Sequence, residues 1–381
     1  MRGYYLHIPF CEKKCSYCDF YSLETTQHID AFVETLLREI TMRADDATDT
    51  SSTTPVTSVF FGGGTPSLLS PAALTRIVNH VRAHVAVAAN AEWTMECNPG
   101  TVTAETLQGY AAAGINRLSF GVQSFTASEL EFLDRIHSAD EASQAMSLAR
   151  AAGFENVNMD LMFAVPGQTY DTLQYNLQRM LALQPDHISA YSLIYEHGTP
   201  LFAKMKKGLV TPTSEDVDAA MYALVIDTLA RAGYEQYEVS NFARPGKRCM
   251  HNRTYWLCES YTAVGPSAHG LLGSTRYWNH RSLTQWTAKV HANELPEANR
   301  ETLSTNEQLT EFLFCTLRAE GIPIATVQQR FGIDIRTALA EHLPDWMSAD
   351  FVRDTGSHLT LTAEGYRVCD ELTLRMLACV E

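Results

Sequence analysis

Residues 7–20 read HIPFCEKKCSYCDF, and they place Cys11, Cys15 and Cys18 directly after a predicted β-strand at Tyr4–Pro9. A four-iron cluster normally takes four thiolates, so a loop with three cysteines leaves one iron open to a small molecule. We therefore expect these three cysteines to hold an iron–sulfur cluster that also binds a ligand.

Two other uses of these cysteines fit the sequence less well. A structural zinc site needs a fourth ligand, and the nearest candidates, His7 and His28, do not stand at a zinc-finger spacing. Disulfides form in oxidising compartments, whereas no apolar signal segment follows Met1, so we expect a cytoplasmic protein with reduced thiols. The spacing favours iron–sulfur binding over both.

The composition suits a large α/β domain with smaller additions. The chain has 381 residues, more than one ordinary domain needs, and 45% of them are hydrophobic. No segment approaches about 18 uninterrupted apolar residues, which disfavours a membrane span and leaves peripheral membrane contact open. The net charge of −15 disfavours a nucleic-acid surface, and we expect the basic run at Lys204–Lys207 to be a solvated helix end.

Short β-rich runs alternate with longer amphipathic runs over residues 1–200, which predicts a partial, open (βα)6 barrel of the α/β class. The predicted strands are Tyr4–Pro9, Val56–Phe61, Glu92–Cys97, Arg117–Val122, Val157–Phe163 and His187–Leu193. The predicted helices are Ile29–Arg43, Pro71–Val85, Thr103–Ala113, Ala139–Ala152 and Tyr170–Leu183.

The pattern changes after residue 200. We expect an α+β extension over residues 201–300, with a helix near Ser214–Ala232 followed by irregular aromatic-rich segments. A linker near Asn293–Thr305 should lead to a small winged-helix-like domain over residues 301–381, with a short strand at Leu359–Thr362. Such units often only cover a barrel, so we expect no DNA binding from it.

A glycine run, Gly62–Gly64, follows the second predicted strand and is followed by Thr65. Glycines let the backbone approach a ligand closely and offer free N–H groups, and the threonine adds a hydroxyl. A simple tight turn is the alternative for such a loop. Because it lies at a strand end beside the cysteines, we expect a cradle for the ammonium and carboxylate of an amino acid.

Polar residues at the ends of the later predicted strands extend this predicted binding site. Glu96 ends the third strand, where its carboxylate can accept hydrogen bonds from both ribose hydroxyls or, alternatively, form a surface salt bridge. Gln123 and Asp160 can bind further hydroxyls. Arg135 can fork onto a carboxylate or, alternatively, form an ion pair at the barrel rim. The implied ligand is a nucleoside that carries an amino acid.

These residues resemble the radical S-adenosylmethionine (SAM) superfamily, and within it the group of oxygen-independent coproporphyrinogen III oxidases and HemW-type heme chaperones. The matching runs are YLHIPFCEKKCSYCDF, FFGGGTPSLL, ECNPG, RLSFGVQSF, NMDLMFAVPGQT and GYEQYEVSNFA. The resemblance implies a [4Fe-4S] cluster with SAM at its open iron, where one electron cleaves a C–S bond to give methionine and a 5′-deoxyadenosyl radical. It implies these site residues: Tyr5 and Tyr17 beside the cofactor, Gly63, Gly64 and Thr65 at its methionyl end, and Glu96, Gln123, Arg135 and Asp160 around the rest.

Two departures separate this chain from the oxidases that it resembles. Those enzymes carry a further cysteine where Phe20 stands here, and an N-terminal extension ahead of the first strand. Both departures weaken the oxidase interpretation.

The run HNRTYW at residues 251–256 resembles the HNxxYW signature of the HemW-type heme chaperones. This resemblance implies heme binding, with His251 as a hypothetical axial ligand and the rings of Tyr255 and Trp256 against the porphyrin. The alternative for His251 is a buried histidine satisfied by hydrogen bonds. Cys249 and Cys258 are rival ligands.

The leading hypothesis is therefore a heme chaperone that binds a [4Fe-4S] cluster, S-adenosyl-L-methionine and heme. Its expected partners are heme, heme-acceptor proteins and an electron donor for the cluster, and a homodimer is left open. The competing hypothesis is anaerobic oxidative decarboxylation of coproporphyrinogen III. A third class, radical alkylation or tRNA modification, has only the shared barrel in its favour.

Overall fold

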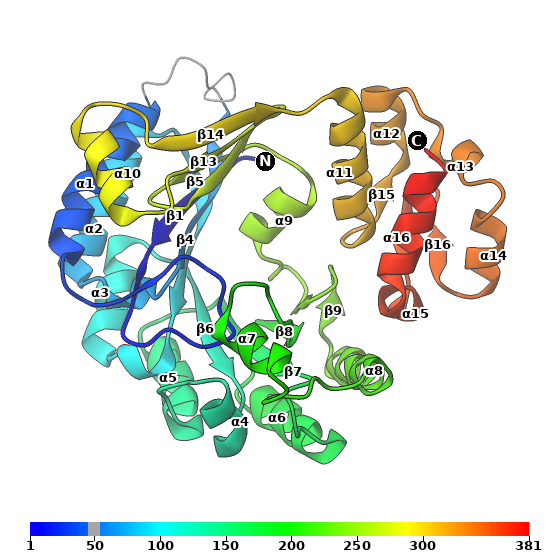
Figure 1. Cartoon of the computed structure of the whole chain (residues 1–381), viewed down its shortest axis with the longest axis horizontal. Helices are drawn as coiled ribbons and strands as arrows, with labels where there is room; N and C mark the ends of the chain where they lie inside the picture. The colour runs from blue at the N-terminus through cyan, green and yellow to red at the C-terminus, as the bar shows by residue number, and fades with distance from the viewer. Residues whose placement is uncertain (45–53, 381) are drawn as a thin grey trace.

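The computed structural model describes residues 1–44 and 54–380, and its centre is a curved sheet of twelve strands (Figure 1). Six neighbouring strands run parallel and follow one another in chain order. These are β1 (Gly3–Ile8), β4 (Val56–Gly63), β5 (Val87–Cys97), β6 (Arg117–Gln123), β7 (Val157–Phe163) and β8 (His187–Ser192). All six predicted strands are confirmed, and they form the expected partial parallel barrel.

The connecting helices lie on the outer face of this sheet (Figure 1). They are α1 (Ile29–Ala44), α2 (Pro71–His84), α3 (Ala104–Ala113), α5 (Ala139–Ala151) and α6 (Tyr170–Ala182), as predicted. Their starts are set by polar caps: Ser138 and Glu141, for example, form a capping box at α5, and Ser70 accepts from the Ala73 N–H at α2. A further short helix, α4 (Ala127–Phe132), was not predicted, because six residues show too little periodicity.

The sheet continues beyond both ends of the parallel core. Strand β11 (Tyr261–Val264) pairs with β1, and β12 (His269–Leu272), β13 (Thr275–Asn279) and β14 (Glu297–Thr302) extend it in antiparallel fashion. At the other end β10 (Asn241–Ala243) pairs with β8 and β9 (Glu235–Gln236). The expectation of irregular segments here was wrong. These strands are short, from two to six residues, so their alternation is too weak to detect from sequence.

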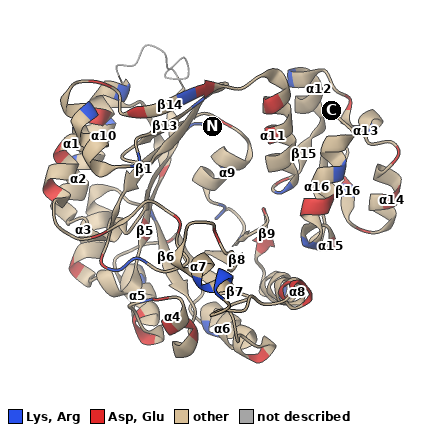
Figure 2. Cartoon of the chain, viewed as in Figure 1, with Lys and Arg blue, Asp and Glu red and all other residues tan. Residues whose placement is uncertain are grey.

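The linker predicted near Asn293–Thr305 is also corrected, because its central part forms the edge strand β14. The remaining helices of this region are α7 (Pro200–Lys206), α8 (Glu215–Arg231), α9 (Met250–Trp256) and α10 (Leu283–His291). Helix α8 matches the predicted Ser214–Ala232. The lysines at the end of α7 are exposed, as expected of a solvated helix end (Figure 2).

A buried carboxylate ties the antiparallel strands to the barrel. Glu39, on α1, is fully buried and accepts hydrogen bonds from the Gly265 N–H at 2.7 Å, Asn279 Nδ2 at 2.6 Å and Trp286 Nε1 at 2.7 Å. Arg43, one helical turn further, lies 3.6 Å from it and also pairs with Glu297 on β14. A buried charge needs such partners, so these contacts fix the extension against α1.

The C-terminal domain has its own three-stranded sheet, in the order β15 (Ile322–Pro323), β17 (His358–Leu361), β16 (Val352–Asp354). Its helices are α11 (Thr305–Leu317), α12 (Ile324–Phe331), α13 (Ile335–Ala338), α14 (Leu343–Ser348), α15 (Ala363–Arg367) and α16 (Cys369–Ala378). This arrangement agrees with the winged-helix-like expectation. The domain boundaries near residues 200 and 300 stay a prediction. In the described parts of the chain, no helix is both long and apolar enough to cross a membrane.

Candidate functional site

The three cysteines of the opening motif face one small cavity of about 70 Å³. Cys11 lies in the two-residue strand β2 (Phe10–Cys11), which pairs with β3 (Leu23–Glu24), so the chain between them forms a closed loop. Cys15 and Cys18 follow in this loop. Thr65 Oγ1 lies 3.5 Å from Cys11 Sγ, and Arg135 Nη1 lies 3.6 Å from Cys15 Sγ. Donors to sulfur stabilise thiolates, which are the form that binds iron.

The arrangement fits a cluster better than a zinc ion. The three thiols surround a cavity, and neither histidine nearest to them in sequence supplies a fourth ligand. Both nitrogens of His7 are engaged elsewhere, Nδ1 with Tyr5 Oη at 3.1 Å and Nε2 with the Tyr21 carbonyl at 2.8 Å. His28 is exposed and does not line the cavity. The chemistry of three thiols around a void therefore suits a [4Fe-4S] group.

The glycine run packs the end of β4 directly against the start of the cysteine loop. Gly63 has a φ of +108°, and a Cβ there would lie 2.6 Å from the His7 ring. The expected free N–H groups are not found: the Gly63 N–H donates to Glu96 Oε2 at 3.2 Å, and the Gly64 N–H to the Ile8 carbonyl at 2.8 Å. What the glycines provide is close approach rather than unused donors.

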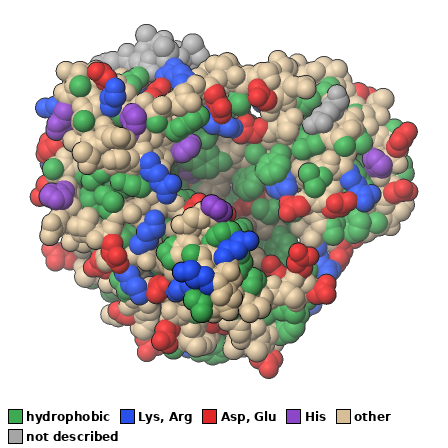
Figure 3. All heavy atoms as spheres, viewed as in Figure 1, with side chains coloured by type: hydrophobic (Ala, Val, Ile, Leu, Met, Phe, Trp, Pro, Cys, Tyr) green, Lys and Arg blue, Asp and Glu red, His purple; other side chains and the backbone are tan. Residues whose placement is uncertain are grey.

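A much larger cavity, of about 1010 Å³, adjoins the cysteine cavity. It is visible as the hollow between the barrel and the C-terminal domain (Figure 3). The residues that line both cavities are Tyr17, Cys18, Gly63, Gly64, Thr65, Asn98 and Arg135. Of the predicted site residues outside the cysteines, all but Tyr5 and His251 line the large cavity. The carboxyl ends of the parallel strands thus converge as the barrel architecture requires.

Two carboxylates face each other across the floor of the large cavity. Burial and the charge of Asp160 raise the pKa of Glu96 to about 8, although the Gly63 N–H opposes this. Burial also raises the pKa of Asp160, which accepts from Asn158 Nδ2 at 2.7 Å. Glu96 is therefore no surface salt-bridge partner. Two buried acids whose charges interact favour either a cationic partner or the protonation of one of them.

Arg135 lines both cavities, and Gln123 lines the large one. The guanidinium of Arg135 donates to the Gly121 carbonyl at 2.7 Å and to Asn98 Oδ1 at 3.3 Å, and its buried Nε has no partner. These contacts place Arg135 inside the cavity rather than in an ion pair at the rim. Gln123 ends β6 with a φ of +67°, a conformation uncommon outside glycine.

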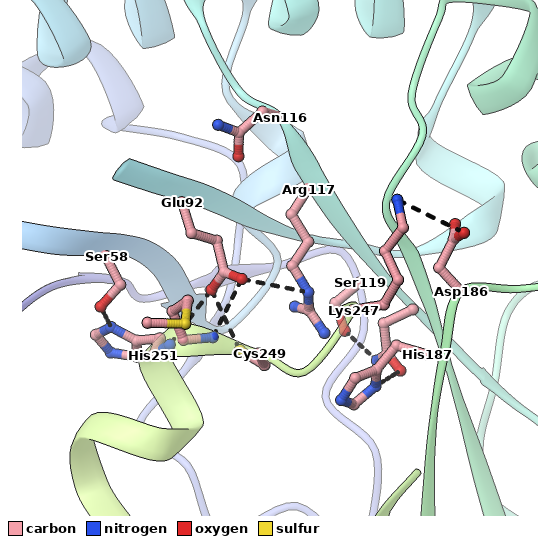
Figure 4. Close-up of polar contacts among 12 residues, drawn as sticks. Ser58, Glu92, Asn116, Arg117, Ser119, Asp186, His187, Lys247, Cys249 and His251 are labelled. Atoms are coloured by element: carbon pink, nitrogen blue, oxygen red, sulfur yellow. Dashed lines mark hydrogen bonds and ion pairs between the residues drawn. The ribbon is translucent and has the colours of Figure 1, made fainter. Parts of the chain in front are cut away.

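His251 lies on α9, beside Ser58 of β4, and does not line the large cavity (Figure 4). Only 1% of its surface is exposed, Nδ1 is 3.0 Å from Ser58 Oγ, and Nε2 is 2.8 Å from Tyr255 Oη. Its ring stacks on Phe60, and burial lowers its pKa to about 3. The arrangement matches the alternative of a hydrogen-bonded buried histidine, and neither nitrogen is available to iron. The axial-ligand role of His251 stays a prediction that this arrangement does not support.

Glu92 holds the start of α9 against the barrel. Its carboxylate accepts from the Met250 N–H at 3.1 Å, the His251 N–H at 3.3 Å and Cys249 Sγ at 3.4 Å, so it caps the start of α9 (Figure 4). Arg117 Nε lies 4.0 Å from the same carboxylate. Cys249 is fully buried in this network, where burial raises its thiol pKa to about 12. It too is absent from the cavity wall.

The outer wall of the large cavity was not predicted. It is formed by residues of the C-terminal domain, namely Arg318, Tyr366, Arg367, Cys369 and Asp370, and by residues of α8, which contacts α15, including Glu215, Asp218 and Tyr222. No motif marks these residues, since their placement depends on how the domain packs against the barrel. The Val239 N–H, for example, donates to the Arg318 carbonyl at 3.0 Å.

Residues 5–180 match the Radical SAM superfamily, and residues 303–368 match the HemN C-terminal domain. The solved structure of coproporphyrinogen III oxidase (HemN) from Escherichia coli has a TM-score of 0.82 and 24% identity to this chain, with 99% of this chain and 89% of that one covered. Fold and cysteine site together define a radical SAM protein.

Comparison with curated proteins shows which family within this class the chain belongs to. Heme chaperone HemW from Bacillus subtilis is 33% identical, with 98% of both chains covered. HemW from Mycobacterium tuberculosis (strain H37Rv) is 35% identical over 98% of this chain and 94% of the relative, and HemW from Escherichia coli is 41% identical over 70% and 69%. The chain belongs to the HemW family.

Proposed function

We propose that this protein is a heme chaperone that binds a [4Fe-4S] cluster on Cys11, Cys15 and Cys18, binds SAM beside it, and carries heme to acceptor proteins. The observation that carries the proposal is the continuity of the two cavities, which share seven lining residues (Tyr17, Cys18, Gly63, Gly64, Thr65, Asn98 and Arg135). At about 1010 Å³ the large cavity lies at the upper end of the range of ligand pockets, roughly 300–1,000 Å³. In this proposal SAM would occupy its inner end, beside the cysteines, and heme would bind further out.

The inner end suits SAM in its chemistry. The glycine run and Thr65 would hold the methionyl end, Arg135 its carboxylate, and Glu96 and Asp160 the ribose hydroxyls and the sulfonium charge. Tyr17 lines the same space. Tyr5 lies behind it: a Cβ on Gly62 would meet both the Tyr5 ring, at 3.0 Å, and Glu96, at 3.2 Å. When bound, the cluster supplies one-electron reduction, and the protein supplies position.

The outer end suits a flat apolar ligand with acidic edges. Phe20, Tyr191 and Ile194 line the cavity with 62%, 40% and 64% of their surfaces exposed, more than large apolar side chains normally show in groups. Arg318 and Arg367 lie on the C-terminal wall, where they pair with Asp370 at 2.6 Å and with Glu364 at 2.7 Å. Propionates would bind these guanidinium groups in exchange for those carboxylates. Helix α8, which contacts α15, is acidic at its start (Figure 2), so we expect the propionates to lie away from it.

Heme titration of the cluster-loaded protein under anoxic conditions tests this proposal. We expect a saturable Soret band and no conversion of added coproporphyrinogen III in the presence of SAM and a reductant. Conversion to protoporphyrinogen IX would instead make the protein an oxidase, and the absence of any saturable heme spectrum would remove the chaperone function.

The iron ligand can be assigned in the same titration. Cys369 and Met162, whose sulfur atoms are possible iron ligands, line the cavity, whereas His251 does not. We expect Cys369→Ser or Met162→Leu to shift the Soret maximum, and His251→Ala to leave it in place while lowering the unfolding midpoint, because Ser58 and Tyr255 lose a buried partner. A Soret shift in His251→Ala alone would assign the ligand to α9.

The affinity for SAM should depend on pH through Glu96. With a pKa of about 8, this carboxyl is mostly protonated at pH 7 in the empty site and must lose its proton to accept from ribose. Linkage then predicts that affinity rises roughly tenfold from pH 7 to pH 9. Calorimetric titration of wild type and Glu96→Gln, with equal iron content, measures this. The variant should bind more weakly and show a flatter pH profile, and equal profiles would place Glu96 outside the ligand contacts.

A further inference from the structure

Two cysteines outside the opening motif lie against each other where the barrel meets the C-terminal domain. Cys258 follows the end of α9 in a left-handed turn, with a φ of +50°, and its N–H donates to the Tyr255 carbonyl. Cys315 lies on α11, the first helix of the C-terminal domain. Both are free and half-buried, and each thiol has the largest influence on the pKa of the other. The helices α9 and α11 are in contact.

Charged contacts hold the two helices beside this pair. Arg253, on α9, forms a forked ion pair with Glu320 just after α11, with Nε–Oε1 at 2.7 Å and Nη2–Oε2 at 3.0 Å. Arg248 reaches the same carboxylate at 3.0 Å. A bidentate pair fixes the relative orientation of two groups as well as their distance. This ion pair therefore holds α9 against the end of α11, next to the two cysteines.

The pair is chemically asymmetric. The hydrogen bond from Cys258 lowers the pKa of Cys315, whereas the same contact raises the pKa of Cys258. The thiolate is the nucleophile in disulfide exchange, so Cys315 is suited to attack first and Cys258 to resolve.

We propose that Cys258 and Cys315 are a redox modification site, a dithiol that closes to a reversible disulfide between α9 and α11. With a low-molecular-weight disulfide such as glutathione disulfide as oxidant, the Cys315 thiolate attacks one sulfur and releases one glutathione. Cys258 then loses its proton, attacks the Cys315 sulfur and releases the second glutathione. The two protein thiols lose two electrons, and the oxidant becomes two glutathione thiols.

This disulfide would link the C-terminal wall of the large cavity covalently to the extension of the barrel. Cys315 belongs to the domain that supplies Arg318, Tyr366 and Cys369 to the large cavity, whereas Cys258 belongs to the extension of the barrel. The oxidised form would hold that wall at fixed distance, and the reduced form would leave only the noncovalent contacts. The inference stands on the thiol pair alone and does not require that the cavity binds heme.

Peptide mapping tests the site directly. Cluster-loaded protein is incubated anoxically with glutathione disulfide, denatured, alkylated with N-ethylmaleimide and digested. We expect a cross-linked peptide pair that contains Cys258 and Cys315, lost after treatment with dithiothreitol. Recovery of both residues as the maleimide adduct, or disulfides only at other cysteines, would overturn the proposal.

Variants separate the two roles and control for general oxidation. Cys258→Ser should leave a glutathione adduct on Cys315, while Cys315→Ser should leave Cys258 largely unmodified. Cys379→Ser, at a half-buried cysteine in the same domain, should form the cross-link as wild type does. Oxidised wild type should unfold at a higher urea concentration than reduced wild type, and Cys258→Ser should show no such difference. An equal difference in Cys258→Ser would assign the effect to another bond.

Discussion

Replacing any one of Cys11, Cys15 and Cys18 by alanine is expected to abolish cluster assembly. Each thiol faces the same cavity of about 70 Å³, and no other cysteine lines it, within the residues that the structure describes. Two thiolates leave a second iron of the cube without a protein ligand, so we expect loss of nearly all bound iron rather than a partial decrease.

Iron and acid-labile sulfide, measured after anoxic reconstitution, give the result. Cys379→Ala serves as the control, because this half-buried cysteine lies on the C-terminal side of α16, away from the cavity. Far-UV circular dichroism should be unchanged in all variants. A full iron complement in all three cysteine variants would contradict the assignment.

Gly64→Ala should also cost the cluster, although it removes no ligand. A Cβ at this position would lie 2.6 Å from the Phe10 carbonyl oxygen and 2.9 Å from the Ile8 carbonyl oxygen. These are backbone atoms, and they belong to the strand and loop that carry Cys11. Relief would require breaking the bonds from the Gly64 N–H to Ile8 and from the Thr65 N–H to Phe10, at 2.8 and 2.7 Å.

We expect Gly64→Ala to lose most of its iron and to be destabilised by about 1–3 kcal/mol, the usual range for overpacking. Iron analysis and urea unfolding measure the two effects. Gly100→Ala is a matched control, because its Cβ would meet its nearest neighbour, His137 Cβ, at an ordinary 3.6 Å. Wild-type iron and stability in Gly64→Ala would show that the loop adapts without the close packing described above.

The parallel core could be predicted because its signals are local. Apolar runs such as Val157–Phe163 alternate with amphipathic segments that begin at capping residues such as Ser138, and both features are read within a dozen residues. The edge strands could not be predicted in the same way. β9 and β10 have two and three residues, and they exist as strands only because β10 pairs with β8 and β9 pairs with β10.

The inner site followed from the fold, since strand ends of a parallel barrel meet at one face. Glu96, Gln123 and Asp160 lie far apart in sequence but share the cavity floor. His251 shows the limit of this reasoning. A short motif does not reveal which way a side chain points, and here Glu92 caps α9 so that the histidine faces the interior. Long-range packing also placed Arg318 and Cys369 in the wall without any sequence signal.

Glu39 has a consequence for any shortened form of this chain. Its three hydrogen-bond donors, Gly265, Asn279 and Trp286, all lie beyond residue 200. A chain that ended at residue 200 would keep the cysteines and the cavity floor. It would remove these three donors from the Glu39 carboxylate and leave the edge of β1 that now pairs with β11 without a partner strand, open to association with other chains. The barrel is therefore continuous in sequence, but it does not stand alone as a unit of folding.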